Sequence, residues 1–431
     1  MIIENKNIQD CIVKIVEKYP FVKDIFQTID QAGGKILLVG GSVRDFFLEM
    51  ESNDLDFEVY HLAFEVLQKI LERYGQVHLV GKSFGVLRLN ILNADFSLPR
   101  KDSSGRKPDV FIDQNMTYSL AFRRRDLTIN AMGIDVNTGQ LIDPFNGLID
   151  LKNKILRALD LELFAEDPLR LFRVMQFAGR LEFAVDEKLS EICSIMNTSQ
   201  VSRERIEDEF KKLFLQSKKP SIGLSWLEKI KKTKELFPEI MWSEKIYLVI
   251  DQVAQLKNSD LESRLIFSWA ALFSNMQIVK DLAIFLEKPV DKIIIKKIIT
   301  ILDPFILKRT DKKNITFIIL YARYLPELIN QKKVQPYKWL AWWIRKTISI
   351  RELMLFCYCL FDKKIIKQAY DVFKDLQLLD QAEEPLLHGG DLILYSSEKN
   401  QLKSLIELAY QLQIDEQIQT KEKLLERLKL K

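Results

Sequence analysis

Residues 36–45 read ILLVGGSVRD, and the prediction of the fold starts from this stretch. Four apolar residues typical of a buried strand lead into a glycine pair and then into a polar segment that predicts the start of a helix. A turn of this kind leaves backbone N–H groups free at the beginning of a helix, where they can bind a phosphate. Gly41 lies in that turn, and Arg44, further along the same helix, can add guanidinium donors to the same anion.

A second informative stretch, residues 54–60, reads DLDFEVY. Apolar and acidic residues alternate along it, so that Asp54, Asp56 and Glu58 share one face of a predicted strand. Two carboxylates in this spacing can share a hard divalent cation with phosphate oxygens, a ligand set that Mg²⁺ prefers. Taken alone, the two stretches are a tight turn and the solvated face of a half-buried strand. Their adjacency favours a nucleotidyl-transfer site.

The order GGSVRD and then DLD resembles the class II tRNA nucleotidyltransferase and bacterial poly(A) polymerase family. The resemblance is strong over residues 35–215. It implies an enzyme that adds CMP and AMP from CTP and ATP to the 3′ end of tRNA, without a nucleic-acid template. It also implies that Asp54 and Asp56 are the catalytic carboxylates and hold Mg²⁺, and that Gly41 and Arg44 help to hold the triphosphate.

The composition is that of a globular protein with several domains. Of its residues, 47% are hydrophobic and 29% are charged. At 431 residues the chain is too long for a single core. A formal net charge of +4 permits nucleic-acid binding through a local basic face without requiring it. The cysteines (Cys11, Cys193, Cys357 and Cys359) form no Cys-x-x-Cys pair, so we expect neither a zinc site nor a disulfide framework and infer a reducing, cytoplasmic location. We expect no signal peptide and no membrane-spanning segment.

The periodicity of apolar residues changes near residue 150, from short strands and helices to long amphipathic helices. We therefore predict an α+β fold with a small nucleotidyltransferase head built on a mixed sheet (1–150), followed by an all-α neck (151–220), body (221–310) and tail (311–431). Lysines dotted along the helices after residue 220 predict a surface that binds tRNA phosphates, although solvated lysines on a helical core explain them equally well.

Within the head, the pattern predicts a helix at 43–50 and a flexible polar loop at 99–108. It predicts strands at 36–39, 54–60, 76–80, 85–92, 95–98 and 129–136.

Residues 123–132 read RRRDLTINAM. A basic, solvated turn before a buried strand is the simple interpretation of such a run. The segment also closely resembles the family's Arg-Arg-Asp-x-Thr-Ile-Asn-Ala motif. Concentrated positive charge near the phosphate site can bind a triphosphate, and Asp126 can accept hydrogen bonds from ribose hydroxyls. The resemblance implies that Arg125 contacts the nucleotide and that Asn130 supports it.

Residues 166–173 read EDPLRLFR and bear most on base specificity. Asp before Pro at a helix start is typical of an N-cap, and on that interpretation the arginines that follow are ordinary exposed residues. On a functional interpretation, Asp167 and Arg170 share one helix face. The carboxylate can accept from an exocyclic amine while the guanidinium donates to the adjacent ring nitrogen. Cytosine and adenine satisfy both groups, whereas uracil and guanine leave them unpaired at a high cost.

The same segment resembles the family's Glu-Asp-x-x-Arg motif, whose residues act as a protein template in place of nucleic acid. The resemblance implies that Asp167, Arg170 and Arg173 bind the incoming nucleotide. Many members carry a further arginine where this chain has Gln176, which leaves the outer part of the nucleotide site open.

Several alternatives stay open. Asp95 is either a third carboxylate facing the acidic pair or a surface aspartate. A poly(A) polymerase, or an enzyme that adds only CC or only A, belongs to the same class. The segment 80–86 (VGKSFGV) looks more like the tRNA enzymes, and the mixed charge of the loop at 99–109 favours the addition of A. An inactive RNA-binding protein of the same fold is the rival from another class, and the joint presence of the catalytic and template residues argues against it. The oligomeric state and the tRNA features recognised are not predicted.

Overall fold

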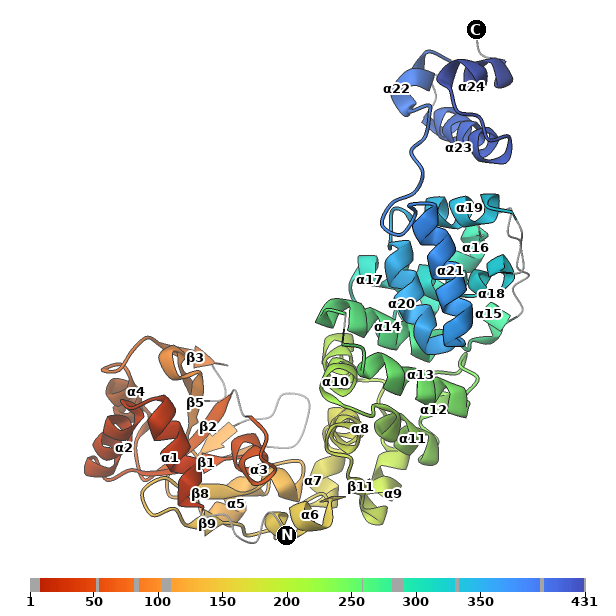
Figure 1. Ribbon diagram of the computed structural model, residues 1–431. Coiled ribbons are helices and arrows are strands. Elements are labelled where there is room, and N and C mark those ends of the chain that lie inside the picture. Colours follow the sequence, from red (N-terminus) through yellow and green to blue (C-terminus); the bar gives the residue numbers. More distant parts are fainter. Residues whose placement is uncertain are drawn as a thin grey trace. The chain divides into compact units, whose positions relative to one another are not determined.

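The computed structural model describes residues 8–51, 54–80, 85–102, 110–257, 259–280, 290–329, 333–395 and 399–429 (Figure 1). Most of the segment at 80–86 and of the loop at 99–108 lies outside these residues, so the predictions made for them stay predictions. The chain divides into two compact units, unit 1 (residues 1–202 and 222–233) and unit 2 (residues 203–221 and 234–431). The finer division into head, neck, body and tail also stays a prediction.

Unit 1 is built on a mixed sheet, which confirms the predicted fold class of the head (Figure 1). Its strands are β1 (Lys35–Val39), β2 (Leu55–Tyr60), β3 (Val77–Val80), β4 (Val86–Leu89), β5 (Ala94–Ser97), β8 (Gly133–Asp135) and β9 (Leu141–Ile142). They lie in the order β3-β4-β5-β2-β1-β8-β9. β2 and β5 are parallel, and the other neighbouring pairs are antiparallel.

The centre of this sheet is buried because β1 is apolar on both faces. Helices α1 (Gln9–Lys18), α2 (Val22–Gln31) and α4 (Phe64–Leu71) belong to the same unit, and α2 packs against both β1 and α4. The ring of Phe57 on β2 stacks on Phe96 of β5 at 4.9 Å between centroids and meets Phe26 of α2 edge-on at 5.5 Å. Full burial of such a side chain stabilises a fold by about 1.5–3 kcal/mol. The strand that begins beside Asp54 and Asp56 is therefore anchored in a packed core.

Four segments of the head differ from their predicted bounds or type. Helix α3 spans Gly41–Phe47 instead of 43–50, because the Gly40 carbonyl already accepts the Arg44 N–H and a left-handed residue, Glu49, follows its end. The strand predicted at 85–92 ends at Leu89, and a 3-10 turn, η2 (Asn90–Leu92), follows it.

The strand predicted at 129–136 is reduced to β8, because η3 (Thr128–Asn130) closes a turn through its backbone N–H groups. The predicted loop at 99–108 begins with a strand, β6 (Arg100–Asp102), which pairs with β7 (Val110–Ile112).

Short elements connect the sheet to a long helix, α8 (Leu169–Leu181), within the same unit. They are α5 (Tyr118–Phe122), α6 (Gly147–Asn153), β10 (Ile155–Leu156) and α7 (Leu161–Ala165), and β11 (Ala184–Val185), α9 (Glu187–Ile195) and α11 (Ser221–Lys229) follow α8. Nine of the eleven residues from Leu169 to Gly179 are buried, so that this helix is part of the core of unit 1.

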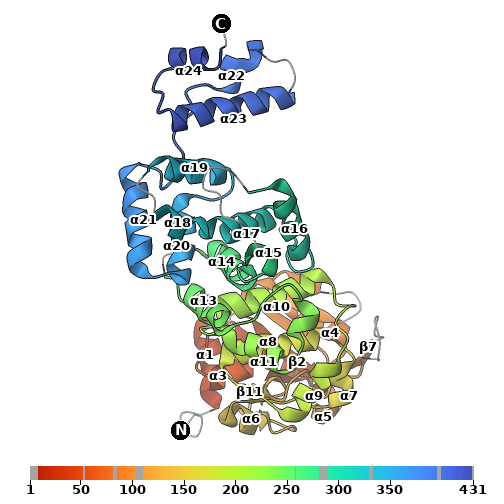
Figure 2. The same cartoon turned by 90° about the vertical axis from the view of Figure 1, so that its right-hand side faces the viewer.

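The elements of unit 2 that the structure describes are helices, as the sequence predicted, apart from one isolated β-bridge between Ile240 and Met276 (Figure 2). Its larger helices are α10 (Arg203–Gln216), α13 (Glu244–Ala254), α14 (Leu261–Phe273), α16 (Lys292–Leu302), α17 (Arg309–Ala322), α19 (Gln335–Ile344), α20 (Ile350–Leu360), α21 (Lys363–Asp375) and α23 (Lys399–Asp415). Its shorter ones are α12 (Thr233–Leu236), α15 (Gln277–Lys280), α18 (Tyr324–Ile329), α22 (Gly389–Leu392), η4 (Ile393–Tyr395) and α24 (Lys421–Arg427).

Aromatic side chains hold unit 2 together. Phe210 of α10 packs against Trp269 of α14 at 5.1 Å between ring centroids, and Phe237 stacks on Phe305 at 4.5 Å. Further along the chain, Trp342 of α19 stacks on Tyr410 of α23 at 3.6 Å, which joins the C-terminal helices to the rest of the unit.

The four cysteines are free and buried. Burial raises the pKa of the Cys193 and Cys359 thiols to about 12 and the pKa of Cys357 well above its usual value. None of the helices in the described part of the chain is both long and apolar enough to span a bilayer.

Candidate active site

The turn between β1 and α3 brings backbone and arginine into close contact. Gly40 has a φ of 74°, in the left-handed region that favours glycine, and its N–H donates to the Met132 carbonyl at 3.1 Å. A Cβ atom at this position would lie 2.7 Å from Arg125 Nη1, so only glycine leaves room for that guanidinium. The predicted strand–Gly-Gly–helix turn is confirmed, and it places Arg125 directly against the turn.

Arg44 lies inside unit 1 rather than at its surface. Its Nε and Nη2 contact Asp45 Oδ1 at 2.8 and 2.7 Å, and its Nη1 donates to Asn130 Oδ1 at 2.5 Å. Its guanidinium also packs over the ring of Phe177 on α8, 4.9 Å from the centroid. All three nitrogens of Arg44 therefore have protein partners, and its expected contact with a phosphate stays a prediction.

Asp54 and Asp56 lie at the beginning of β2, both exposed. Asp54 Oδ1 accepts a hydrogen bond from Asn93 Nδ2 at 2.8 Å. Asp95 on β5 lies directly opposite Asp56, as expected if it faces the acidic pair, and Arg88 Nη1 is 3.5 Å from its Oδ1. Asp95 thus belongs to the acidic group, with part of its charge balanced by Arg88.

The electrostatics of this group suit a cation. Although Asp56 is exposed, the protein around it removes enough water to raise its pKa, and the neighbouring Asp95 and Asp54 raise it further against the opposing charge of Arg125. Desolvation also raises the pKa of Asp95, with Arg88 opposing it. Among the described residues no group of three or more His, Cys, Asp or Glu side chains is arranged to hold a metal ion. A two-carboxylate site that phosphate oxygens and water would complete fits the ligands of a hard divalent cation.

Glu58 corrects the sequence prediction for β2. The alternation places it on the same face as the aspartates, which was expected to be solvated, yet its side chain is 0% exposed. Its Oε1 accepts a hydrogen bond from the Tyr60 hydroxyl at 2.5 Å, and its Oε2 lies 3.5 Å from Arg124 Nη2 and 3.6 Å from Arg125 Nη2. Two arginines from a later segment of the chain cover this face, and the strand pattern by itself carries no sign of them.

The three consecutive arginines contact different partners. Arg123 forms a surface ion pair with Asp160, whereas Arg124 and Arg125 both point toward Glu58. Burial lowers the pKa of Arg125, and the charge of Glu58 is the strongest of the effects that oppose this. The segment is therefore not the solvated basic turn of the simple interpretation, since two of its guanidinium groups gather beside the acidic strand.

Asp126 is buried between the sheet and α8. Its Oδ2 accepts from Arg173 Nε at 2.6 Å, and its Oδ1 accepts from Asn130 Nδ2 at 2.9 Å and from the Leu127 N–H at 2.8 Å. Burial alone would raise the pKa of Asp126, but the Arg173 charge and these hydrogen bonds outweigh it and hold the pKa at about 2. The expected contact of Asp126 with ribose stays a prediction, and the Asp126–Arg173 pair joins the arginine segment to α8.

The remaining template candidates lie at the start of α8. Asp167 Oδ1 accepts the Leu169 N–H at 3.1 Å, which satisfies one backbone donor of the first turn. Arg170 donates from Nη1 to the Leu163 carbonyl at 2.9 Å and from Nη2 to the Arg124 carbonyl at 2.7 Å. The capping role of Asp167 is thus present in the structure, and the arginine that would read the base is fixed to the segment that carries Arg124.

Two features of α8 had no counterpart in the prediction. The ring of Phe177 lies within 6 Å of three guanidinium groups, since Arg173 and Arg180 approach its centroid at 5.5 and 5.7 Å in addition to Arg44. Gln176 is buried and accepts from Arg180 Nη1 at 3.4 Å. An arginine therefore lies beside the position where many family members carry one, although it comes from the next turn of the helix.

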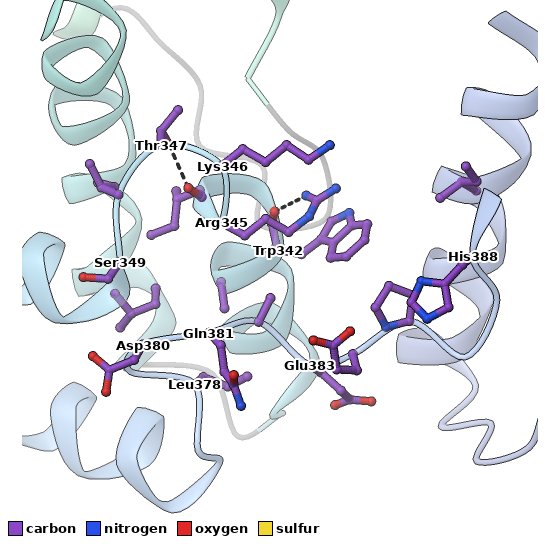
Figure 3. Close-up of a pocket in the computed structure, with 18 of the residues that line it drawn as sticks. Trp342, Arg345, Lys346, Thr347, Ser349, Leu378, Asp380, Gln381, Glu383 and His388 are labelled. Atoms are coloured by element: carbon purple, nitrogen blue, oxygen red, sulfur yellow. Dashed lines mark hydrogen bonds between the residues drawn. The ribbon is translucent and has the colours of Figure 1, made fainter. Parts of the chain in front are cut away.

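Unit 2 contains a separate cleft of about 730 Å³, whose lining includes Trp342, Arg345, Asp380 and His388 (Figure 3). The Arg345 guanidinium lies over the Trp342 ring at 3.1 Å, and Asp380 forms an ion pair with Arg351 at 2.8 Å. The acidic strand, the glycine turn and the arginine segment all belong to unit 1, so we assign this cleft of unit 2 no part in the chemistry.

Comparison with known proteins gives a consistent result. Residues 36–157 match the model of the poly A polymerase head domain. The chain is 37% identical over 217 residues to the multifunctional CCA protein of Haemophilus ducreyi, covering 48% of this chain and 51% of that protein. It is 33% identical over 286 residues to the CCA-adding enzyme of Lactococcus lactis subsp. lactis, covering 64% of this chain and 69% of that enzyme.

The alignments and the fold extend over different lengths. The chain spans about half the length of the first curated relatives it matches, or less. By contrast, the solved structure of the Thermotoga maritima CCA-adding enzyme complexed with tRNA resembles it over 98% of both chains, with a TM-score of 0.64 and 19% sequence identity. That similarity concerns the fold of the whole chain.

Proposed function

The chain belongs to the family of CCA-adding enzymes, and we propose from its site that it adds CMP and AMP, from CTP and ATP, to the 3′ end of tRNA without a nucleic-acid template. The observation that carries this proposal is the meeting of three features in unit 1. Two exposed carboxylates lie at the start of β2, Asp54 just before it and Asp56 within it; Arg125 lies against the glycine turn beside them; and Arg173 ties α8 to the arginine segment. We place the activity in the cytoplasm, where buried thiols remain reduced.

The chemistry assigned to the acidic strand is metal-assisted phosphoryl transfer. Asp54 and Asp56 would hold Mg²⁺, which when bound neutralises charge on the triphosphate and promotes deprotonation of the RNA 3′-hydroxyl. The exposure of both carboxylates supports this assignment. Desolvation raises the pKa of Asp56 and the charges of Asp95 and Asp54 raise it further, and a cation would offset that repulsion.

The triphosphate would bind between the glycine turn and the arginines. Gly41 would offer its backbone N–H, and Arg125 its guanidinium, to phosphate oxygens. Arg44 would help to position Asn130, to which it is hydrogen-bonded. It would also donate to a phosphate oxygen from a guanidinium N–H that now contacts Asp45. Asp126 would accept from a ribose hydroxyl in addition to its contact with Arg173.

Base selection would come from the start of α8. Asp167 would accept from the exocyclic amine of cytosine or adenine, and Arg170 would donate to the adjacent ring nitrogen. Uracil and guanine present a carbonyl and a ring N–H to the same groups, so that a carboxylate would face an oxygen and a guanidinium would face an N–H. Arg173 would hold the helix in register with Asp126.

The test uses tRNA transcripts that end before the CCA, after C and after CC, each incubated with one nucleoside triphosphate at a time. The proposal predicts addition of CMP to the first two and of AMP to the third, with little use of UTP or GTP. Extended runs of A on any of the transcripts would indicate a poly(A) polymerase, and addition of only CC or only A would indicate a partial enzyme. Binding of tRNA with no addition of any nucleotide would indicate an inactive RNA-binding protein and would refute the proposal.

A further inference from the structure

The buried carboxylate of Glu58 has no part in the reaction as proposed so far. It lies two residues after Asp56 on the same strand, with a side chain that is 0% exposed. Its Oε2 has no hydrogen-bond partner among the described residues, but two guanidinium groups face that oxygen at 3.5 and 3.6 Å. A buried carboxylate is costly unless it is paired. The negative charge of Glu58 is therefore stabilised by Arg124 and Arg125, and their positive charges are stabilised by Glu58.

Arg125 has two carboxylates within reach. One is Glu58; the other is Asp56, whose Oδ2 lies 3.7 Å from the position of a Cβ on Gly40, while Arg125 Nη1 lies 2.7 Å from the same point. A guanidinium that paired fully with Asp56 would neutralise a carboxylate that the proposed reaction reserves for a metal ion. Two adjacent guanidinium groups also repel each other unless an anion lies between them.

We propose that Glu58 is a positioning residue that holds the Arg124–Arg125 pair beside the glycine turn, so that Arg125 faces the incoming triphosphate and stays off Asp56. This inference rests on the proposed function, since it requires that a nucleoside triphosphate binds there. Within the group formed by Glu58, Arg124 and Arg125, two guanidinium charges face one carboxylate, and the remaining positive charge suits a phosphate oxygen. The other oxygen of Glu58 is fixed by the Tyr60 hydroxyl at 2.5 Å, so the carboxylate itself has little freedom to follow the arginines.

The experiment compares the wild-type chain with Glu58→Gln, which keeps the shape of the side chain and removes its charge. We expect the KM for CTP, with tRNA ending before CCA, to rise about tenfold, the factor that corresponds to roughly 1.4 kcal/mol, with a smaller change in kcat. Binding of CTP in the absence of tRNA, measured by calorimetry, should weaken by a similar factor. The apparent affinity for Mn²⁺, used as the probe metal without nucleotide, should also fall, because Arg125 is then free to pair with Asp56.

A matched control separates this effect from the general loss of a buried carboxylate. Glu209 of α10 is 3% exposed, pairs with Lys212 at 2.7 Å and, like Glu58, carries one oxygen without a hydrogen-bond partner among the described residues. Glu209→Gln should leave the KM for CTP and the affinity for Mn²⁺ unchanged. Equal effects of the two substitutions on these quantities would overturn the inference.

A double-mutant cycle with Arg125→Ala provides the sharper test. If Glu58 acts through Arg125, Glu58→Gln should weaken CTP binding by less than about twofold once Arg125 is removed, whereas independent effects would multiply. Should Glu58→Gln not fold, Glu58→Asp keeps the charge but withdraws it from the arginines, and its smaller rise in KM should likewise vanish in the Arg125→Ala background. If Glu58→Gln binds CTP as tightly as the wild-type protein does, this inference alone is refuted. If the wild-type protein neither binds CTP nor extends tRNA, the proposed function is refuted.

Discussion

Asp167 is the residue at which capping and base recognition can be separated by experiment. Its Oδ1 accepts the Leu169 N–H at 3.1 Å, and its backbone carbonyl accepts the Arg170 N–H at 2.9 Å. Replacement by Ala removes both the cap and the proposed acceptor for the base, so Asp167→Ala by itself does not distinguish the two roles. Asn is a matched replacement because it caps helices about as well as Asp while its amide offers donors as well as an acceptor.

The expected magnitudes follow from these contacts. Loss of a cap costs about 0.5–2 kcal/mol, so Asp167→Ala should lower the stability of the protein, while Asp167→Asn should leave it nearly unchanged. Loss of a hydrogen bond to a charged group costs about 1.5–3 kcal/mol, so both variants should add CMP about ten- to a hundredfold more slowly. In Asp167→Asn the amide can donate to the O4 of uracil, so the rate with UTP should rise while the rate with CTP falls. The ratio of the two rates should therefore fall by more than the loss of CMP addition alone would produce.

The assay is single-nucleotide incorporation with all four triphosphates, beside a melting curve for each variant. A capping role without base recognition predicts that Asp167→Asn keeps both its stability and its order of nucleotide preference. Undiminished preference for CTP and ATP in a stable Asp167→Asn protein would therefore refute the template role of Asp167.

Three further predictions concern the metal site, the RNA surface and the buried Asp126. Asp54→Asn or Asp56→Asn should abolish the addition of both CMP and AMP while tRNA binding, measured by gel shift, survives; near-normal turnover would move the metal site away from β2. The affinity for tRNA should fall steeply with salt, because phosphate contacts release bound counterions, and a flat dependence would exclude a lysine-rich surface as the main contact. Because Asp126 has a pKa of about 2, below its ordinary value of 3.8, it contributes stability that is present above pH 3.8 and lost as the pH falls toward 2, about 2 kcal/mol in all. Asp126→Asn should flatten that part of a melting series between pH 5 and 2, and an unchanged acid dependence would contradict the assignment.

The sequence was sufficient to predict the mixed sheet, the largely helical remainder and the glycine turn, although the short parallel pair of β10 and β11 lies in the segment 151–220 that was predicted to be all-α. These features depend on local patterns: an apolar run before Gly40, alternation along β2, and helical periodicity after residue 150. Bounds were less accurate where a single backbone position decides them, as at Glu49, whose left-handed conformation follows the end of α3.

The environment of individual site residues was harder to predict, because it is set by segments distant in the sequence. Alternation along β2 states that Glu58 shares a face with Asp56, but it cannot state that Arg124 and Arg125 will cover the far end of that face. The expected contact of Arg44 with a phosphate stays a prediction, but its local sequence does not indicate that its guanidinium also packs on a helix that begins more than a hundred residues later. A cluster of charged motifs that must all meet at one turn is a signal that such residues bind one another as well as a substrate.

The burial of all four thiols makes the protein well suited to site-specific labelling. Maleimides react with thiolates, and a buried thiol with a pKa of about 12, such as Cys193 or Cys359, supplies almost none at neutral pH. The substitution Ile195→Cys in unit 1 or Leu394→Cys in unit 2 would place a thiol at a position that is 79% or 87% exposed, respectively. Such a thiol would react with a maleimide while the four buried native thiols would not. With a donor dye at one of these positions and an acceptor dye at the other, energy transfer between them would report the distance between the two units during each cycle of nucleotide addition.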